Sequence, residues 1–233
     1  MNVIITGASK GIGFAIAETF AAQSHTLFLC ARNEDELLAA AQQLKQAYPT
    51  ATIHTQVSDI TDSHQRKIFA VWVLRQAKTI DVLVNNAGKF IPGSVHNEEA
   101  GTLEEMISTN LYSAYHITRL FINQMMEQRS GHVFNICSIA SLQAYDNGGS
   151  YSISKFALLG FSKNLREEMK PYGVKVTAVL PGATMSASWD GFNIEPNRIM
   201  EAGDIAQMVY TASQLSPQAV VEDIVLRPQK GDL

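Results

Sequence analysis

Tyr151 and Lys155 lie four positions apart in the stretch YSISK, shortly after a pair of glycines. On an α-helix this spacing places both side chains on one face, so a phenol and an ammonium group come within reach of each other. Such a pair can move a proton, because the neighbouring cation favours the phenolate form of the tyrosine. The same spacing is also common on ordinary helix surfaces, and the rest of the chain must decide between these interpretations.

The composition indicates a folded chain without an electrostatic partner. Hydrophobic residues make up 46% of the 233 positions, and the formal net charge is −4. Because the charge is small and forms no blocks, we expect neither nucleic acid nor an anionic membrane as a partner. The N-terminal stretch lacks the features of a signal peptide, and no apolar run approaches the roughly 20 residues that span a bilayer. We therefore expect a cytoplasmic protein.

The metal-binding residue types show no useful spacing. Cys30 and Cys137 each lie in an apolar run, and the six histidines are scattered along the chain. We predict two buried free cysteines and no metal site.

Seven short runs rich in β-branched residues predict the strands of a sheet. They cover residues 2–6, 25–31, 52–57, 80–85, 132–137, 174–180 and 221–227. The longer segments between them have room for crossover helices, which predicts a parallel sheet with helices on both faces, a doubly wound α/β fold. Ligands bind such sheets at the carboxyl ends of the strands, so site residues should directly follow a strand.

A glycine-rich turn, TGASKGIG, follows the first of these strands and opens a helical pattern. Glycines in such a turn allow a tight bend and a close approach to a pyrophosphate, which the helix N-terminus attracts. The spacing is GxxxGxG. The predicted cofactor contacts in this turn are Gly7, Ser9, Lys10, Gly11, Ile12 and Gly13.

The acid that usually follows the second strand of a dinucleotide-binding fold is absent. That acid binds the 2′-hydroxyl of the adenosine ribose, and here the place holds Arg32. An Arg fork suits a 2′-phosphate, and Lys10 would add a second cation, which favours NADP(H) over NAD(H). In the alternative interpretation Arg32 is a solvated surface residue, and Glu34 or Asp35 turns back to the ribose.

Seven motifs in order along the chain resemble those of the short-chain dehydrogenase/reductase family. They are TGASKGIG from Thr6, SDITD from Ser58, NNAG from Asn85, STNLY from Ser108, NICSIAS from Asn135, YSISK from Tyr151 and LPGAT from Leu180. The resemblance implies a single Rossmann-type domain over residues 1–233, with a short substrate lid at 184–202. It also implies a homodimer or homotetramer.

The resemblance assigns roles to particular positions. The implied catalytic residues are Asn110 in a long helix, Ser138, Tyr151 and Lys155. Further implied cofactor contacts are Asp59 and Ile60 at the adenine, and Asn85, Ala87 and Gly88 after the fourth strand, where Asn86 is mainly structural. At the nicotinamide end they are Tyr151 and Lys155 themselves, together with Pro181, Gly182 and Thr184. Tyr145, Trp189 and Phe192 are the candidates for contacts with the substrate.

The implied reaction interconverts a carbonyl and an alcohol by hydride transfer. The carbonyl oxygen gains negative charge and needs both a hydrogen-bond donor and a proton, for which Ser138 and Tyr151 are suited. A free tyrosine has a pKa near 10, and a cation about 4 Å away would lower it by about three units at an effective dielectric constant near 20. We therefore expect Lys155 to bring the pKa of Tyr151 toward neutrality.

Three rival functions fit parts of the sequence. An NAD-dependent dehydrogenase of the same fold differs at the place held by Arg32. A nucleotide-sugar epimerase or dehydratase would carry a larger C-terminal substrate domain. A non-enzymatic dinucleotide sensor would be expected to lose parts of the site, whereas all four implied catalytic residues are present. The sequence therefore favours an NADP(H)-dependent carbonyl reductase.

Overall fold

The structure is a computed structural model that describes residues 1–185, 195 and 197–232. A seven-stranded parallel sheet runs through it in the order β3-β2-β1-β4-β5-β6-β7. The strands are β1 (Asn2–Thr6), β2 (Thr26–Ala31), β3 (Thr52–Val57), β4 (Val82–Asn85), β5 (Gly131–Ile136), β6 (Val174–Pro181) and β7 (Asp223–Leu226). The predicted doubly wound Rossmann-type fold is thereby confirmed.

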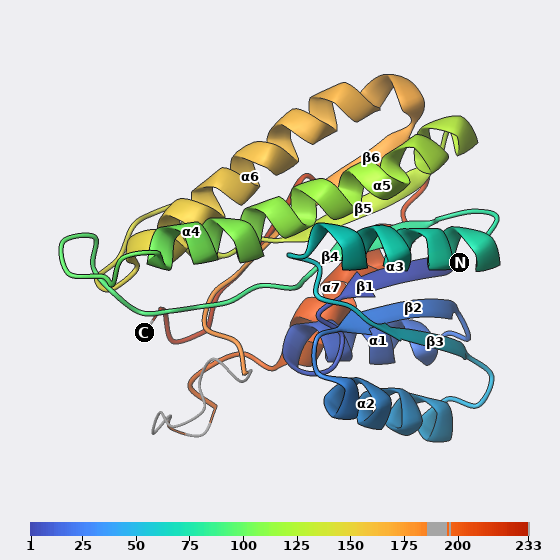
Figure 1. Cartoon of the computed structure of the whole chain (residues 1–233), viewed down its shortest axis with the longest axis horizontal. Helices are drawn as coiled ribbons and strands as arrows, with labels where there is room; N and C mark the ends of the chain where they lie inside the picture. Colours follow the sequence, from blue (N-terminus) through green and yellow to red (C-terminus); the bar gives the residue numbers. More distant parts are fainter. Residues whose placement is uncertain (186–194, 196, 233) are drawn as a thin grey trace.

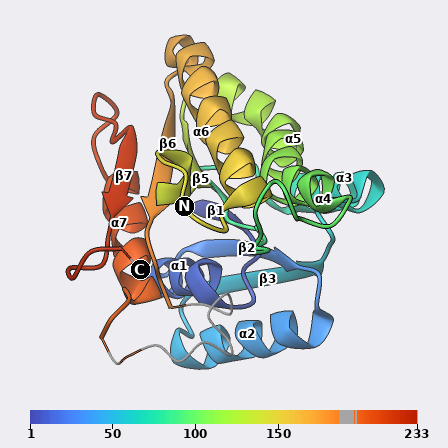
Figure 2. The same cartoon turned by 90° about the vertical axis from the view of Figure 1, so that its left-hand side faces the viewer.

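Helices cover both faces of the sheet (Figures 1 and 2). One layer holds α1 (Gly11–Ala21), α2 (Glu34–Ala47) and α7 (Ala202–Ser213), and the other holds α3 (Ser63–Gln76), α4 (Thr102–Ile107), α5 (Ser113–Gln128) and α6 (Gly149–Met169). Within the described part of the chain, no helix has the length and apolar character needed to cross a bilayer.

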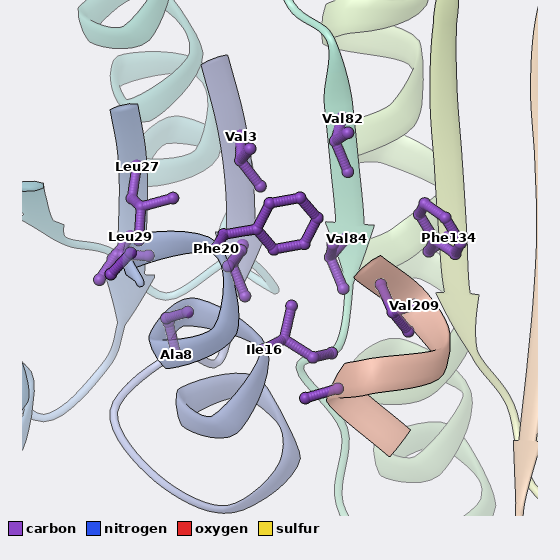
Figure 3. Close-up of a cluster of buried hydrophobic side chains, with 14 of the residues drawn as sticks. Val3, Ala8, Ile16, Phe20, Leu27, Leu29, Val82, Val84, Phe134 and Val209 are labelled. Carbon is purple, nitrogen blue, oxygen red and sulfur yellow. The ribbon is translucent and has the colours of Figure 1, made fainter. Parts of the chain in front are cut away.

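The inner strands β1, β2 and β4 are largely apolar because both faces of the sheet are buried there. In β1, Val3 and Ile5 contribute to the core beneath α1 and α7, whereas Ile4 between them points into the core on the other face. Figure 3 shows Phe20 of α1 and Val209 of α7 packed over Val84 and Val3. This alternation fixes the register of the central strands, since a shift by one residue would exchange the two faces.

The order of the strands places the binding site. The chain leaves β1 toward β2 and β3 on one side and then returns to add β4 on the other side of β1. In parallel sheets, the crevice at this reversal opens at the carboxyl ends of the strands and binds ligands. The turn after β1 and the turn after β4 therefore lie side by side at the place where the sequence predicts a cofactor.

Candidate active site

A cavity of about 1200 Å³ opens at the carboxyl ends of the strands. Most of the predicted site residues line it: Gly7, Ser9, Lys10, Gly11, Ile12, Arg32, Asp59, Ile60, Ala87, Gly88, Ser138, Tyr145, Tyr151, Lys155, Pro181, Gly182 and Thr184. Gly13, Asn85 and Asn110 lie behind its wall, and Trp189 and Phe192 fall outside the described residues. The structure thus gathers predicted cofactor and catalytic positions from opposite ends of the chain around one cavity.

The glycines of the first turn are required by close backbone contacts. Gly7 has a φ of +63°, and a Cβ there would lie 2.9 Å from the Cα of Ala87. A Cβ on Gly13 would lie 2.3 Å from the carbonyl oxygen of Gly7. Gly13 therefore serves the packing of α1 against the turn, which explains why it does not reach the cavity.

The first turn of α1 suits an anion. Its N-cap residue, Lys10, makes no side-chain cap, and no acidic residue lies in the first turn. The N–H groups at the start of a helix lack partners within the helix, and the helix dipole favours negative charge there. The residues present therefore fit the pyrophosphate of a dinucleotide.

The turn after β4 is tied to the turn after β1. The hydroxyl of Thr6 accepts hydrogen bonds from the backbone N–H groups of Asn86 and Ala87, both at 3.1 Å. The amide of Asn86 donates back to the carbonyl oxygens of Thr6 and Gly7 at 3.0 and 2.9 Å. These bonds fix the two turns to each other, so Asn86 shapes the cavity through the backbone that it holds.

The side chain of Asn85 faces away from the cavity. Its amide nitrogen donates to the Thr118 hydroxyl at 2.9 Å and to Oδ1 of Asn135 at 2.8 Å. Asn135 in turn donates to the hydroxyl of Ser162 on α6. Asn85 therefore links β4, β5 and the two helices over them, and the structure gives it a supporting place rather than one on the cavity wall.

Tyr151, Lys155 and Ser138 meet at one end of the cavity. Tyr151 and Lys155 lie in the first two turns of α6, with the Lys155 Nζ 5.7 Å from the centroid of the Tyr151 ring. Nζ also donates to the backbone carbonyl of Ile136 at the end of β5, at 2.8 Å. Ser138 follows the same strand, and its hydroxyl accepts a hydrogen bond from the Ala140 N–H at 3.1 Å. The Ser138 side chain also lies within hydrogen-bonding reach of the Tyr151 phenol.

The pKa values in this cluster are set by burial. Burial raises the pKa of Tyr151, and the Ser138 side chain opposes that shift. Burial also lowers the pKa of Lys155 to about 8. The pKa of Tyr151 is thus shifted away from neutrality, opposite to the direction expected from Lys155, because desolvation of the phenolate is the largest contribution.

Asn110 lies in a π-helical turn, Ser108–Tyr112, between α4 and α5. The predicted long helix is thus present but widened by one residue at this point, as is frequent near functional sites. The Asn110 amide donates to the carbonyl of Lys89 at 3.0 Å and to the hydroxyl of Ser154 at 2.8 Å, and its Oδ1 accepts from the Lys89 N–H at 2.7 Å. Asn110 therefore anchors the segment after β4 to α6, the helix that carries Tyr151 and Lys155.

Phe90 is a neighbour of Tyr151 that the sequence motifs do not indicate. Its ring meets the Tyr151 ring edge to face, with centroids 4.9 Å apart and an interplanar angle of 79°. Phe90 also lines the cavity. It follows the NNAG motif by two positions, so only its place in a segment already tied to the site could have suggested this contact.

The opposite end of the cavity carries opposing charges. Arg32 is exposed directly after β2, and Lys10 of the glycine turn lines the same cavity. Glu36 forms an ion pair with Lys10, with Nζ and Oε1 3.1 Å apart, and accepts a hydrogen bond from the Ser9 hydroxyl at 3.3 Å. Glu34 and Asp35 do not line the cavity. The acid that turns toward the glycine loop is therefore Glu36, and neither of the two that the sequence suggested.

Glu36 could have been found from a capping pattern. Asn33 is the N-cap of α2 and accepts a hydrogen bond from the Glu36 N–H at 3.0 Å. An acidic residue three positions after such a cap points back toward the start of the helix. Here the start of the helix faces the glycine turn.

The wall near the predicted lid is built from the C-terminal part of the chain. Thr184 and Met200 form an isolated parallel bridge, with the Met185 N–H donating to the Met200 carbonyl at 2.8 Å. This bridge joins the two ends of the predicted lid segment. Asp232 also lines the cavity, close to Gly182. No pattern in the sequence connects Asp232 with the site, because its position depends on the path of the chain after β7.

The two cysteines are buried thiols. Cys30 and Cys137 are buried, and burial raises the pKa of these thiols to about 12 and about 11. Among the described residues, no three side chains of His, Cys, Asp or Glu are grouped so that they could hold a metal ion.

A family model described as short chain dehydrogenase matches residues 1–195. The chain belongs to the short-chain dehydrogenase family. Members of this family are oxidoreductases, and the resemblance seen in the seven motifs is confirmed. A sepiapterin reductase of Chlorobaculum tepidum is 32% identical over 240 residues, which cover 99% of this chain and 97% of the relative.

Solved structures of short-chain dehydrogenases superpose on the whole fold. An alcohol dehydrogenase of Thermococcus sibiricus, in complex with 5-hydroxy-NADP, has a TM-score of 0.91 at 26% identity, covering 98% of this chain and 96% of the other. A metagenomic short-chain oxidoreductase in complex with NADP has a TM-score of 0.85 at 29% identity, covering 98% and 97%. The cavity described above thus lies in a fold that binds nicotinamide dinucleotides in its relatives.

Proposed function

We propose that this short-chain dehydrogenase interconverts a carbonyl and an alcohol, with NADP(H) as cofactor and Tyr151 as the general acid and base. One observation carries the proposal. Tyr151, Lys155 and Ser138 meet at one end of a cavity whose other end is formed by a glycine turn and a helix N-terminus. A proton donor and a phosphate cradle in one cavity suit a hydride transfer between a dinucleotide and a carbonyl.

The cofactor, when bound, supplies or accepts the hydride. The glycine turn and the start of α1 would hold its pyrophosphate, and Asp59 with Ile60 would contact the adenine. Pro181 and Gly182, at the carboxyl end of β6, would hold the nicotinamide end beside Lys155. The cavity volume of about 1200 Å³ exceeds that of an ordinary ligand site and leaves room for a small substrate next to a dinucleotide.

Three side chains divide the work at the reacting oxygen. Ser138 donates a hydrogen bond to the carbonyl oxygen, where negative charge develops, and Tyr151 supplies the proton. Burial keeps Tyr151 protonated before reduction, because it raises the pKa of the phenol. The ammonium of Lys155 stabilises the phenolate that remains after the transfer.

The preference for NADP(H) over NAD(H) depends on Arg32 and Lys10. Both side chains line the end of the cavity near β2, where their positive charges suit a 2′-phosphate. Solved relatives in complex with NADP support this choice. An NAD-dependent dehydrogenase and a non-enzymatic dinucleotide sensor are the alternatives, and cofactor titration together with turnover separates all three.

The test of the proposed chemistry is Tyr151→Phe, which removes one hydroxyl and keeps the ring. We expect turnover of a panel of ketones, aldehydes and other carbonyls, followed by NADPH oxidation, to fall by about 10²–10⁴-fold, the usual contribution of a general acid. NADPH binding, measured by fluorescence titration, should stay unchanged. Turnover retained by this variant would exclude the role given to Tyr151.

Tyr172→Phe is the matched control for this experiment. Tyr172 lies in the short 3-10 turn that follows α6, at the end of the helix remote from Tyr151, and does not line the cavity. The same change of one hydroxyl should leave turnover unaffected there.

A wild-type protein that binds NADPH but turns over no carbonyl would support the sensor alternative.

A further inference from the structure

The Glu36 carboxylate binds two hydrogen-bond donors, Lys10 and Ser9, at the end of the cavity that holds the glycine turn. Its Oε1 lies 3.1 Å from the Nζ of Lys10, and its Oε2 accepts from the Ser9 hydroxyl at 3.3 Å. All three residues line the cavity, together with Arg32 and Asn33. A carboxylate and a phosphate oxygen bind the same kinds of donors, a cation and a hydroxyl. Glu36 therefore takes up the contacts that an anionic group of a ligand would seek.

We propose that Glu36 is a specificity-determining residue, which competes with the 2′-phosphate of NADP(H) for Lys10 and Ser9. The proposal rests on the proposed function, because it assumes that the cavity binds a nicotinamide dinucleotide. NAD(H) lacks the 2′-phosphate and leaves the contacts of Glu36 in place. Glu36 thus weakens the binding of NADP(H) alone and reduces the preference for NADP(H) that Arg32 and Lys10 create.

The backbone holds Glu36 in this position. The Glu36 N–H donates to the side chain of the N-cap residue Asn33, which fixes the first turn of α2 opposite the glycine turn. Glu34 and Asp35, in the same helical turn, are exposed and do not line the cavity. Of the three consecutive acids, Glu36 is therefore the one placed to act on a bound anion.

The size of the effect follows from the exposure of the pair. The Lys10 and Glu36 side chains are 58% and 39% exposed, so solvent screens their attraction. Exposed ion pairs change an equilibrium by about 1.5- to 5-fold. Repulsion between the Glu36 carboxylate and a doubly charged phosphate also weakens NADPH binding. We therefore expect the change in NADPH affinity to lie in the upper part of this range.

The test compares Glu36→Gln with Glu34→Gln. Both changes remove one negative charge from the first turn of α2, but only the first removes the carboxylate that forms the ion pair with Lys10 and accepts from Ser9. Dissociation constants for NADPH and NADH are measured by fluorescence titration in the wild type and in both variants. We expect Glu36→Gln to bind NADPH about three- to fivefold more tightly with NADH binding unchanged, and Glu34→Gln to match the wild type.

A second measurement checks that the effect runs through Lys10. In a Lys10→Gln background the gain in NADPH affinity from Glu36→Gln should shrink, because the cation for which Glu36 and the phosphate compete is gone. A double-mutant cycle quantifies this coupling. A gain of equal size in both backgrounds would contradict competition for Lys10.

Three results would overturn the proposal about Glu36. The first is a ratio of the NADH and NADPH dissociation constants that Glu36→Gln leaves unchanged, and the second is an equal change of this ratio in Glu34→Gln. The third is weaker NADH binding by Glu36→Gln, which would make Glu36 a ligand of the ribose. The proposed cofactor preference fails separately, if the wild type binds NADH more tightly than NADPH. The change caused by Glu36→Gln is read against the wild type in either case, so the two failures are distinguishable.

Discussion

Lys155 is a buried cation whose position lowers the stability of the fold. Its side chain is almost fully buried, and it makes a hydrogen bond to the carbonyl of Ile136. Burial lowers its pKa from 10.5 to about 8, and one pKa unit corresponds to about 1.4 kcal/mol. Keeping Lys155 charged in the folded protein therefore costs about 3 kcal/mol at neutral pH.

Lys155→Met should therefore stabilise the fold at pH 7 while it removes turnover. We expect the free energy of unfolding in urea to rise by about 2 kcal/mol, since loss of the bond to Ile136 offsets about 1 kcal/mol of the gain. The sign follows from the lowered pKa. Below pH 8 both the folded and unfolded wild type carry the charge and the cost is complete, whereas between pH 8 and 10.5 the folded state loses its proton first and the cost fades.

The measurement compares urea unfolding of both proteins at pH 7 and at pH 9.5. The advantage of the variant should shrink at the higher pH, and Lys163→Met, an exposed position on the same helix, should show no such gain. A variant that is less stable than the wild type at pH 7 would refute this account of Lys155.

Single residues were predictable from sequence only where their type and spacing carry meaning. Tyr151 and Lys155 stand out because their spacing matches a helix, and Arg32 stands out because it replaces an acid. Phe90 and Asp232 carry no such signal, since the path of the chain through a loop brings them to the cavity. The pKa of Tyr151 was misjudged because burial is a property of the folded surroundings.

The segment between β4 and α4 is tied to the start of α6, the helix that carries Tyr151. Glu98 accepts hydrogen bonds from both the backbone N–H and the hydroxyl of Ser150, the residue before Tyr151. A Cβ on Gly149 would lie 1.9 Å from Oε1 of Glu98 and 2.6 Å from the carbonyl oxygen of Gly93. The glycine before Ser150 is thus needed because Glu98 and Gly93 approach the helix so closely.

Glu98→Gln should loosen the first turn of α6. A carboxylate at a helix N-terminus interacts with the helix dipole and makes charge-assisted hydrogen bonds, so we expect the free energy of unfolding to fall by about 1–2 kcal/mol. Turnover should fall by up to about tenfold, because Tyr151 follows the anchored residue. NADPH affinity should stay unchanged, since the glycine turn lies at the other end of the cavity.

Thermal unfolding, kcat and NADPH titration together check this prediction, with Glu99→Gln as the control. Glu99 is the next residue along the chain and is exposed. If NADPH binding by Glu98→Gln weakens as much as kcat falls, the residue supports the whole fold rather than the position of Tyr151.

The strands were well predicted because both faces of the sheet are buried. A buried parallel strand appears in the sequence as a continuous apolar run, and each of the seven predicted runs overlaps a strand within one or two residues. The π-helical turn Ser108–Tyr112 was not predicted. Its extra residue is accommodated by contacts of Asn110 with Lys89 and Ser154, which only the folded chain brings together.

The outer surface of α5 and α6 exposes apolar side chains that suit a contact between copies. Tyr115 on α5 and Ile153 and Phe156 on α6 are all more than a third exposed, as is Tyr112 in the π-helical turn before α5. Figures 1 and 2 show α5 and α6 side by side on the outside of one helical layer. Exposed apolar patches of this kind are typical of interfaces. We propose that this face supports a homodimer or homotetramer.

Sedimentation velocity of the wild type should show a dimer or tetramer, and Phe156→Lys should shift it toward smaller species. Folding should be preserved, because the Phe156 side chain is 45% exposed. Leu38→Lys, at a 51% exposed position on α2 in the opposite layer, serves as the control and should leave the assembly unchanged. A wild type that sediments as a monomer would contradict the proposed interface.

The first strand of the chain, β1, lies inside the sheet between β2 and β4. One of its edges pairs with β2. Its other edge pairs with Val82, Leu83 and Val84 of β4, which is synthesised later than β2. At a synthesis rate of about 5–20 residues per second, several seconds pass on the ribosome between the completion of β2 and that of β4. During this interval β1 presents an open hydrogen-bonding edge flanked by apolar side chains, which is a template for pairing with other nascent chains. A strand that is paired on both edges in the finished protein is thus open to aggregation while the protein is being made.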